Sequence, residues 1–258
     1  MNNPPPDQEK QEEYTSILVV HDAFLSGRMM LYELDTKPIR RMRYIGGPEV
    51  TTICALPEGY GWDLATPYMI GYAGVKQLEL RGFKHLQTIS HHFLFQSRLT
   101  SIDLSPLSNV TKIGQYFMAY CNQLESIDRT PFSKVTEIGS TFLITCDALT
   151  TIDLSPLVSL REVGTCFLFS CKSITTINVT LGSLQTVGAY FINSCLSLAS
   201  VDLTSLINIK EVGNDFMVMC PSLSTVAVGP LLAAFPAVAD APLKGLTVLC
   251  TTDDVSTR

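Results

Sequence analysis

Apolar positions recur along this chain with a period of 24 or 25 residues. The clearest unit is LTSIDLSPLSNVTKIGQYFMAYCNQ at residues 99–123, and four further copies of its pattern follow without a break up to residue 222. Weaker copies occupy residues 50–74 and 75–98, and a partial copy begins at residue 223. Self-similarity at a fixed period of this length is typical of stacked structural units. The pattern therefore predicts a repeat protein with seven full units and a partial eighth.

The apolar spacing changes within each unit. Ile102 and Leu104 are two residues apart, which predicts a short strand with both side chains inward and Asp103 outward. Phe117 and Cys121 are four residues apart, which predicts about one helical turn. One unit cannot bury its apolar face alone, so the units must stack and their strands must pair. The predicted fold is an α/β solenoid with a parallel β-sheet on one face and short helical turns on the other.

Two small residues hold fixed positions in the units. A glycine precedes the predicted helical turn, and we expect it either to have a positive φ or to allow close approach between coils. A cysteine ends the turn in five units, whereas Tyr72 and Ser97 take its place in the first two units. An odd number of cysteines with such replacements does not fit a disulfide framework or a metal array. We interpret this column as small buried thiols. Its members are Cys121, Cys146, Cys171, Cys195 and Cys220.

The pattern LxxIxLxxL…IGxxFxxxC resembles the BspA-like class of leucine-rich repeats, over about residues 50–228. The resemblance implies a leucine-rich repeat platform, and function then depends on the surfaces that the platform carries. BspA-like repeats are often found on secreted or surface proteins, so the resemblance also implies an adhesion-type surface protein as an alternative. Two features depart from the pattern: no asparagine follows the strand, and Arg129 takes an inward position that is Leu or Val in other units.

The two ends differ from the repeats. Residues 1–13 are rich in proline and charge and predict a disordered tail. We interpret 14–49 as an N-terminal cap with a degenerate strand around Ile17 and Val19, 229–250 as a C-terminal cap with a last strand at 246–250, and 251–258 as a loose tail. The basic cluster at Lys37, Arg40, Arg41 and Arg43 is interpreted as a solvated cap surface rather than a contact for an acidic partner.

Localisation and membrane association follow from composition. The N-terminus lacks the basic start and apolar middle of a secretory signal, and no run of apolar residues is long enough for a transmembrane helix. We therefore expect a cytoplasmic protein with reduced cysteines. Proteins that bind nucleic acid normally carry a basic stripe, so the net charge of −6 argues against a nucleic-acid partner.

Stacking would create a column of outward carboxylates on the sheet. One hypothesis is that this column is a docking strip for a basic protein partner, or a weak cation site. The alternative is that the carboxylates are solvated, hydrogen-bonded to flanking Ser and Thr, and inherited by duplication. Arg129 is expected to form a structural ion pair with this column, because a buried unpaired charge is costly. The candidate partner-binding residues are Glu79, Asp103, Asp128, Arg129, Asp153 and Asp202.

Motifs of catalysis or metal binding are missing from the sequence. The four histidines lack metal-ligand spacing relative to cysteine or carboxylate residues, and His91 and His92 are interpreted as surface residues. We expect no catalytic residue, no metal and no cofactor; an enzyme would need a deep pocket lined by Asp, His or Cys. The prediction is a non-enzymatic leucine-rich repeat scaffold for protein–protein interaction, with its oligomeric state left open.

Overall fold

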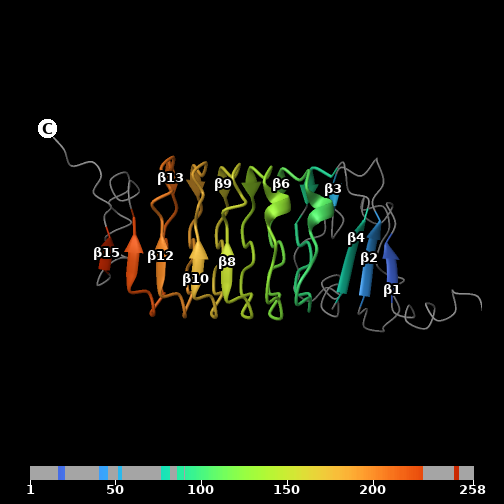
Figure 1. Cartoon of the computed structure of the whole chain (residues 1–258), viewed down its shortest axis with the longest axis horizontal. Coiled ribbons are helices and arrows are strands. Elements are labelled where there is room, and N and C mark those ends of the chain that lie inside the picture. The colour runs from blue at the N-terminus through green and yellow to red at the C-terminus, as the bar shows by residue number, and fades with distance from the viewer. Residues whose placement is uncertain are drawn as a thin grey trace, which may run out of the picture.

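The computed structural model describes residues 17–20, 41–45, 52–53, 77–81, 86–89, 91–228 and 247–249. The chain winds into coils that stack side by side along the long axis, with β1 near one end and β15 near the other (Figure 1). The predicted tails at 1–13 and 251–258 lie outside the described residues, as do most residues of the two predicted caps.

All strand pairs of the described residues are parallel, which confirms the predicted parallel sheet. A five-stranded sheet contains β8 (Thr151–Asp153), β10 (Thr176–Asn178), β12 (Ser200–Asp202), β14 (Thr225–Ala227) and β15 (Thr247–Leu249). A three-stranded sheet contains β1 (Ile17–Val20), β2 (Arg41–Ile45) and β4 (Gln77–Arg81).

A second row of two-residue strands forms a seven-stranded sheet, in which each coil contributes a strand that the sequence did not predict. Its members are β3 (Thr52–Ile53), β5 (Thr88–Ile89), β6 (Lys112–Ile113), β7 (Glu137–Ile138), β9 (Glu162–Val163), β11 (Thr186–Val187) and β13 (Glu211–Val212). A two-residue strand is too short to show the alternation by which strands are recognised. The described coils therefore place two rows of parallel strands around one core, the outer row divided into a three-stranded and a five-stranded sheet.

Stacked phenylalanines fill the centre of the solenoid. Phe117, Phe142 and Phe167 lie in successive coils, and neighbouring rings are nearly parallel with centroids 5.3 and 5.1 Å apart. All three side chains are fully buried, and most inward leucine and isoleucine residues of the described coils are buried with them. Equivalent residues of successive coils therefore form continuous apolar ladders, which no single unit could build alone.

The predicted helical turns are wrong in the described coils. Between Gly114 and Cys121 the backbone alternates, with φ of 57°, 48° and 59° at Tyr116, Met118 and Tyr120. The amides of these three residues donate to main-chain oxygens of neighbouring coils, at 2.9, 2.8 and 2.8 Å. An α-helix would instead direct each amide to the carbonyl four residues earlier. Phe117 and Cys121 are both buried, as their spacing predicted, but an extended inter-coil ladder takes the place of the helix.

Helical structure in the described residues is limited to two short 3₁₀ segments elsewhere in the coil. These are η3 (Ser105–Leu107) and η4 (Thr130–Phe132), each with a proline in its first turn. The fixed φ of proline suits the start of a helix and ends the preceding extended segment. Both segments follow the outer strand position, on the path to the seven-stranded sheet (Figure 1).

The N-terminal register differs from the one predicted for residues 50–74. β2 pairs with β4, which lies 36 residues later, so Arg43 is the register partner of Glu79. β3 pairs with β5 in the seven-stranded sheet, so Ile53 does not belong to the outer strand position. The strand expected around Ile17 and Val19 is β1, and it pairs with β2 in the same parallel manner. Lys37 and Arg40 of the basic cluster lie outside the described residues.

Candidate functional site

The five-stranded sheet brings part of the predicted carboxylate column into one row. Asp153, Asn178 and Asp202 are direct register partners on β8, β10 and β12, and all three side chains are exposed. Asp103 and Asp128 are exposed at the equivalent positions of the two preceding coils, although neither lies in a strand. Glu79 lies on β4 in the separate three-stranded sheet. We call Asp103, Asp128, Asp153, Asn178 and Asp202 the acidic row.

Each aspartate of the acidic row also closes a local turn. The amides of Ser105, Thr130, Ser155 and Thr204 donate to the Oδ1 atoms of Asp103, Asp128, Asp153 and Asp202 at 2.9, 2.9, 3.0 and 2.9 Å. Such Asx turns satisfy backbone donors where the strand ends. The predicted hydrogen bonds to flanking Ser and Thr are thereby confirmed. The aspartates remain exposed, so the row both shapes the turn and presents negative charge.

The same hydrogen bonds affect the acidity of the row. The hydroxyl and amide of Ser105 hold the pKa of Asp103 below its usual value. Slight burial acts to raise the pKa of Asp153, but the hydrogen bonds from Ser155 and the charge of Arg129 outweigh it, so this pKa is also lowered. Both carboxylates are therefore ionised at neutral pH, and the row is negatively charged under ordinary conditions.

Arg129 is buried at the inward position, with 6% of its surface exposed. Its Nε donates to the main-chain oxygen of Asp153 at 2.6 Å, and its Nη1 has no hydrogen-bond partner. Burial lowers the pKa of Arg129 to about 10, opposed by the charges of Asp153 and Asp128, so the guanidinium remains charged at neutral pH. The expected ion-pair contact is absent, because the ion pairs between described residues are Lys112–Glu137 and Lys172–Asp147.

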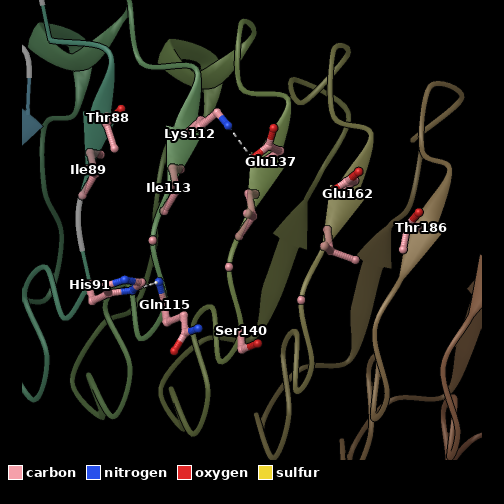
Figure 2. Close-up of a pocket in the computed structure, with 15 residues that line it drawn as sticks. Thr88, Ile89, His91, Lys112, Ile113, Gln115, Glu137, Ser140, Glu162 and Thr186 are labelled. Atoms are coloured by element: carbon pink, nitrogen blue, oxygen red, sulfur yellow. Dashed lines mark hydrogen bonds and ion pairs between the residues drawn. The ribbon is translucent and has the colours of Figure 1, made fainter. Parts of the chain in front are cut away.

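A furrow of about 420 Å³ runs over the outer face of the seven-stranded sheet. Its lining includes Lys112, Glu137 and Glu162 from three neighbouring strands, and glycines of the turn that follows them. Figure 2 shows the ion pair between Lys112 Nζ and Glu137 Oε2, which is 2.8 Å long. It also shows that His91 Nδ1 accepts a hydrogen bond from the main-chain amide of Gln115 at 2.9 Å. The sequence interpretation missed this surface because it rests on the unpredicted second row of strands.

Some polar side chains of the furrow are engaged in contacts within the protein. His91 Nδ1 accepts from the main-chain amide of Gln115. Four cysteines of the repeat column are buried, and Cys220 is partly buried. Among the described residues, no three His, Cys, Asp or Glu side chains are grouped so that they could hold a metal ion.

The cysteine column is structural, as interpreted. Cys146 and Cys171 are fully buried free thiols, and their S–H groups donate to main-chain oxygens of Met118 and Leu143 at 3.2 and 3.0 Å. The prediction that both His91 and His92 are surface residues is wrong for His92. His91 is exposed, but His92 is buried, because its ring stacks on Tyr116 with centroids 4.4 Å apart.

These features define a parallel solenoid built from repeats of about 25 residues, with flat polar faces. The family described as a BspA-type leucine-rich repeat region matches residues 87–224 in six copies, and the chain belongs to this family. The resemblance seen in the sequence is thereby confirmed.

Two solved structures are similar in fold. A leucine-rich cell surface protein from Faecalibacterium prausnitzii A2-165 aligns over 86% of this chain and 72% of its own, with 16% identity and a TM-score of 0.43. A leucine-rich repeat protein from Bacteroides ovatus ATCC 8483 aligns over 83% of this chain, with 17% identity and a TM-score of 0.48; the alignment spans 52% of that protein. No curated protein matches this chain.

The comparisons correct the expected localisation. A cytoplasmic protein was predicted from the N-terminal composition, but the BspA-type repeats of the family to which the chain belongs are typical of surface or secreted proteins. The composition of one N-terminal segment is a weaker guide than the family to which the repeats belong. Among the described residues, no helix has the length and apolar character needed to cross a bilayer.

Proposed function

We propose that the chain is a non-enzymatic leucine-rich repeat scaffold that binds a protein partner through the outer face of its five-stranded sheet. The observation that carries the proposal is the regular exposure of short polar side chains on this face. Thr151, Thr176 and Ser200 form one exposed row, in register beside the acidic row. A flat face of this kind suits a broad protein contact better than a small ligand, which needs a concave site.

Charge supports a basic partner. The carboxylates of the acidic row share one face, and the whole chain has a net charge of −6. Complementary charge accelerates encounter and selects among partners more than it adds affinity. The partner is therefore expected to present a basic surface, and its association rate should fall as salt is added.

The turn geometry provides a way to remove charge without removing structure. Asn178 already occupies the acidic row, and its Oδ1 accepts from the Thr180 hydroxyl at 2.6 Å. Asparagine thus keeps the acceptor that the turn needs. The test variant is Asp153→Asn with Asp202→Asn. The matched control is Glu162→Gln with Glu211→Gln, which removes the same charge from the same two coils but on the other sheet.

The experiment compares wild type and both variants as bait against cell-surface extracts of the source organism, followed by titration of each captured protein. A partner bound at least about tenfold more weakly by the Asp→Asn variant, and normally by the Glu→Gln control, supports the proposal. Equal binding by all three chains contradicts the assignment of this face.

A further inference from the structure

The outer sheet of the solenoid is interrupted at two neighbouring coils. Residues 101–103 and 126–128 occupy the positions of β8 and β10 in their coils but are not strands. All residues here are described. The amides of Glu125 and Ser126 still donate to the Thr100 oxygen, at 2.9 and 3.4 Å, but no main-chain hydrogen bond joins 101–104 to 126–129, or 126–129 to 151–154. The coils of β8 and β10, by contrast, share three register pairs and a bond from the Leu154 amide to the Asn178 oxygen at 2.9 Å.

Arg129 lies at the centre of this interruption. Leu154 and Leu203 hold the equivalent position in other coils, and their amides donate to the carbonyl of the next coil at 2.9 and 2.7 Å. At Arg129 the side-chain Nε, not the amide, donates to that carbonyl, which belongs to Asp153. The guanidinium thus bonds the Asp153 carbonyl oxygen, which is the atom that would accept a main-chain amide if the ladder between the coils continued here. A bulkier, charged group takes the place of leucine between the two coils.

The same coils remain bonded on their other sides. On the seven-stranded sheet, the Gly139 amide donates to Ile113 at 2.8 Å and the Gly164 amide to Ile138 at 2.8 Å. In the turn, the Leu143 amide donates to Phe117 at 3.1 Å. Coils that are held on two sides, and on the third by only the bonds at Thr100 and at the Arg129 side chain, have the geometry of a hinge. Segments with few backbone hydrogen bonds open at the lowest cost.

We propose that Arg129 makes a hinge in the solenoid, at which segment 126–128 opens and closes against its neighbours while the seven-stranded sheet acts as the axis. The hinge stands independently of the proposed binding face. It lies within the acidic row, so opening changes the spacing of Asp103, Asp128 and Asp153. Repulsion between these like charges favours the open form, and salt weakens it.

Amide hydrogen exchange of the full chain tests the hinge, with rates corrected for the intrinsic rate of each residue. In the wild type, the amides of 126–128 should exchange at least roughly tenfold faster than those of 176–178, which lie in a strand bonded on both sides. Arg129→Leu should slow exchange at 126–128 toward that of 176–178. Arg129→Met, which keeps a long side chain without the charge, should act in the same direction and serves if the leucine variant fails to fold.

Leu154→Met is the matched control, because it changes the same column one coil later while conserving volume. It should leave exchange at 126–128 unchanged. Two results would overturn the hinge. One is exchange at 126–128 as slow as at 176–178 in the wild type. The other is unchanged exchange at 126–128 in whichever Arg129 variants fold.

Discussion

Gly188 lies so close to Gly164 of the preceding coil that a methyl group on Gly188 would sit 2.5 Å from the Gly164 carbonyl carbon. The Gly188 amide also donates to the Val163 oxygen at 2.9 Å. The φ of Gly188 lies outside the left-handed region, so of the two explanations expected for the glycine column, close approach between coils applies here. Carbon atoms in favourable contact are about 3.5–4.0 Å apart, so the site has no room for a side chain.

Gly188→Ala should therefore destabilise the protein. The methyl group would collide with backbone atoms, which cannot rotate away as a side chain can, so the two coils would have to separate. Overpacking of this kind costs about 1–3 kcal/mol of unfolding free energy, and backbone contact places the expected loss at the upper end. Urea unfolding of wild type and variant, followed by circular dichroism, measures the loss.

Gly182→Ala is the matched control in the same coil. A methyl group on Gly182 would meet nothing nearer than the Ser205 oxygen at 3.8 Å, which is ordinary contact. Because alanine restricts the unfolded chain more than glycine, this change should be neutral or stabilise by about 0.4–1 kcal/mol. Equal losses in the two variants would show that the close approach at Gly188 does not determine its effect.

The buried thiols should be unreactive in the folded protein. Burial raises the pKa of Cys171 to about 12, so almost no thiolate exists at pH 8. Cys166 is only partly buried and is therefore expected to react before Cys171. Alkylation of the native protein at pH 8, with peptide mass spectrometry, should label Cys166 at least about tenfold faster than Cys171. Denaturant should make both react alike; rapid native labelling of Cys171 would contradict the buried-thiol interpretation.

Burial was predictable from the sequence to a greater extent than backbone conformation. Ile102, Leu104, Phe117 and Cys121 are all buried, because periodic apolar positions report which side chains face the core. A spacing of four residues, however, is compatible with a helical turn and with the inter-coil ladder that the chain adopts. The choice between them depends on hydrogen bonds to residues about 25 positions away, such as Tyr116 to Ser140, which a local pattern does not contain.

Candidate surfaces were predictable only where the strands are long enough to alternate. The acidic row follows from the strand pattern, and Asp153 and Asp202 are aligned as expected. The furrow on the second sheet was missed because its strands have two residues each. Arg129 was recognised as an anomaly, but the sequence could not show that its acceptor is a main-chain oxygen rather than a carboxylate.

His92 should make stability depend on pH in the weakly acidic range. Burial, and to a lesser extent the charge of His91, lowers the pKa of His92 from 6.5 to about 3. The unfolded chain therefore binds a proton near pH 6.5 that the folded chain excludes, so stability is lost as pH falls from 6.5 toward 3. At pH 5 the loss is about 2 kcal/mol, from 1.36 kcal/mol for each pH unit below 6.5.

Replacement of His92 by tyrosine should abolish this dependence, since Tyr116 and Tyr190 hold the same position in other coils. The measurement is the unfolding free energy of wild type and His92→Tyr at pH 7 and pH 5. His91→Asn, at an exposed neighbour, is the control and should keep most of the wild-type dependence. An identical fall in stability for wild type and His92→Tyr would contradict the assignment.

The aspartates of the acidic row should also make stability depend on pH, but at lower pH than His92 does. Hydrogen bonds in the folded state lower the pKa values of Asp103 and Asp153 from 3.8, so their contribution is fully present above pH 3.8 and is lost as pH falls below it. Asp103→Asn with Asp153→Asn keeps the Oδ1 acceptors of both turns and has nothing to protonate there. The double variant should therefore lose less stability than wild type between pH 5 and pH 2.5, measured as the change in Tm. His92 titrates in both proteins and cancels in the comparison. If the Tm of the double variant fell as much as that of the wild type, protonated aspartates would hold these turns as well as charged ones. The charge of the acidic row would then not contribute to stability.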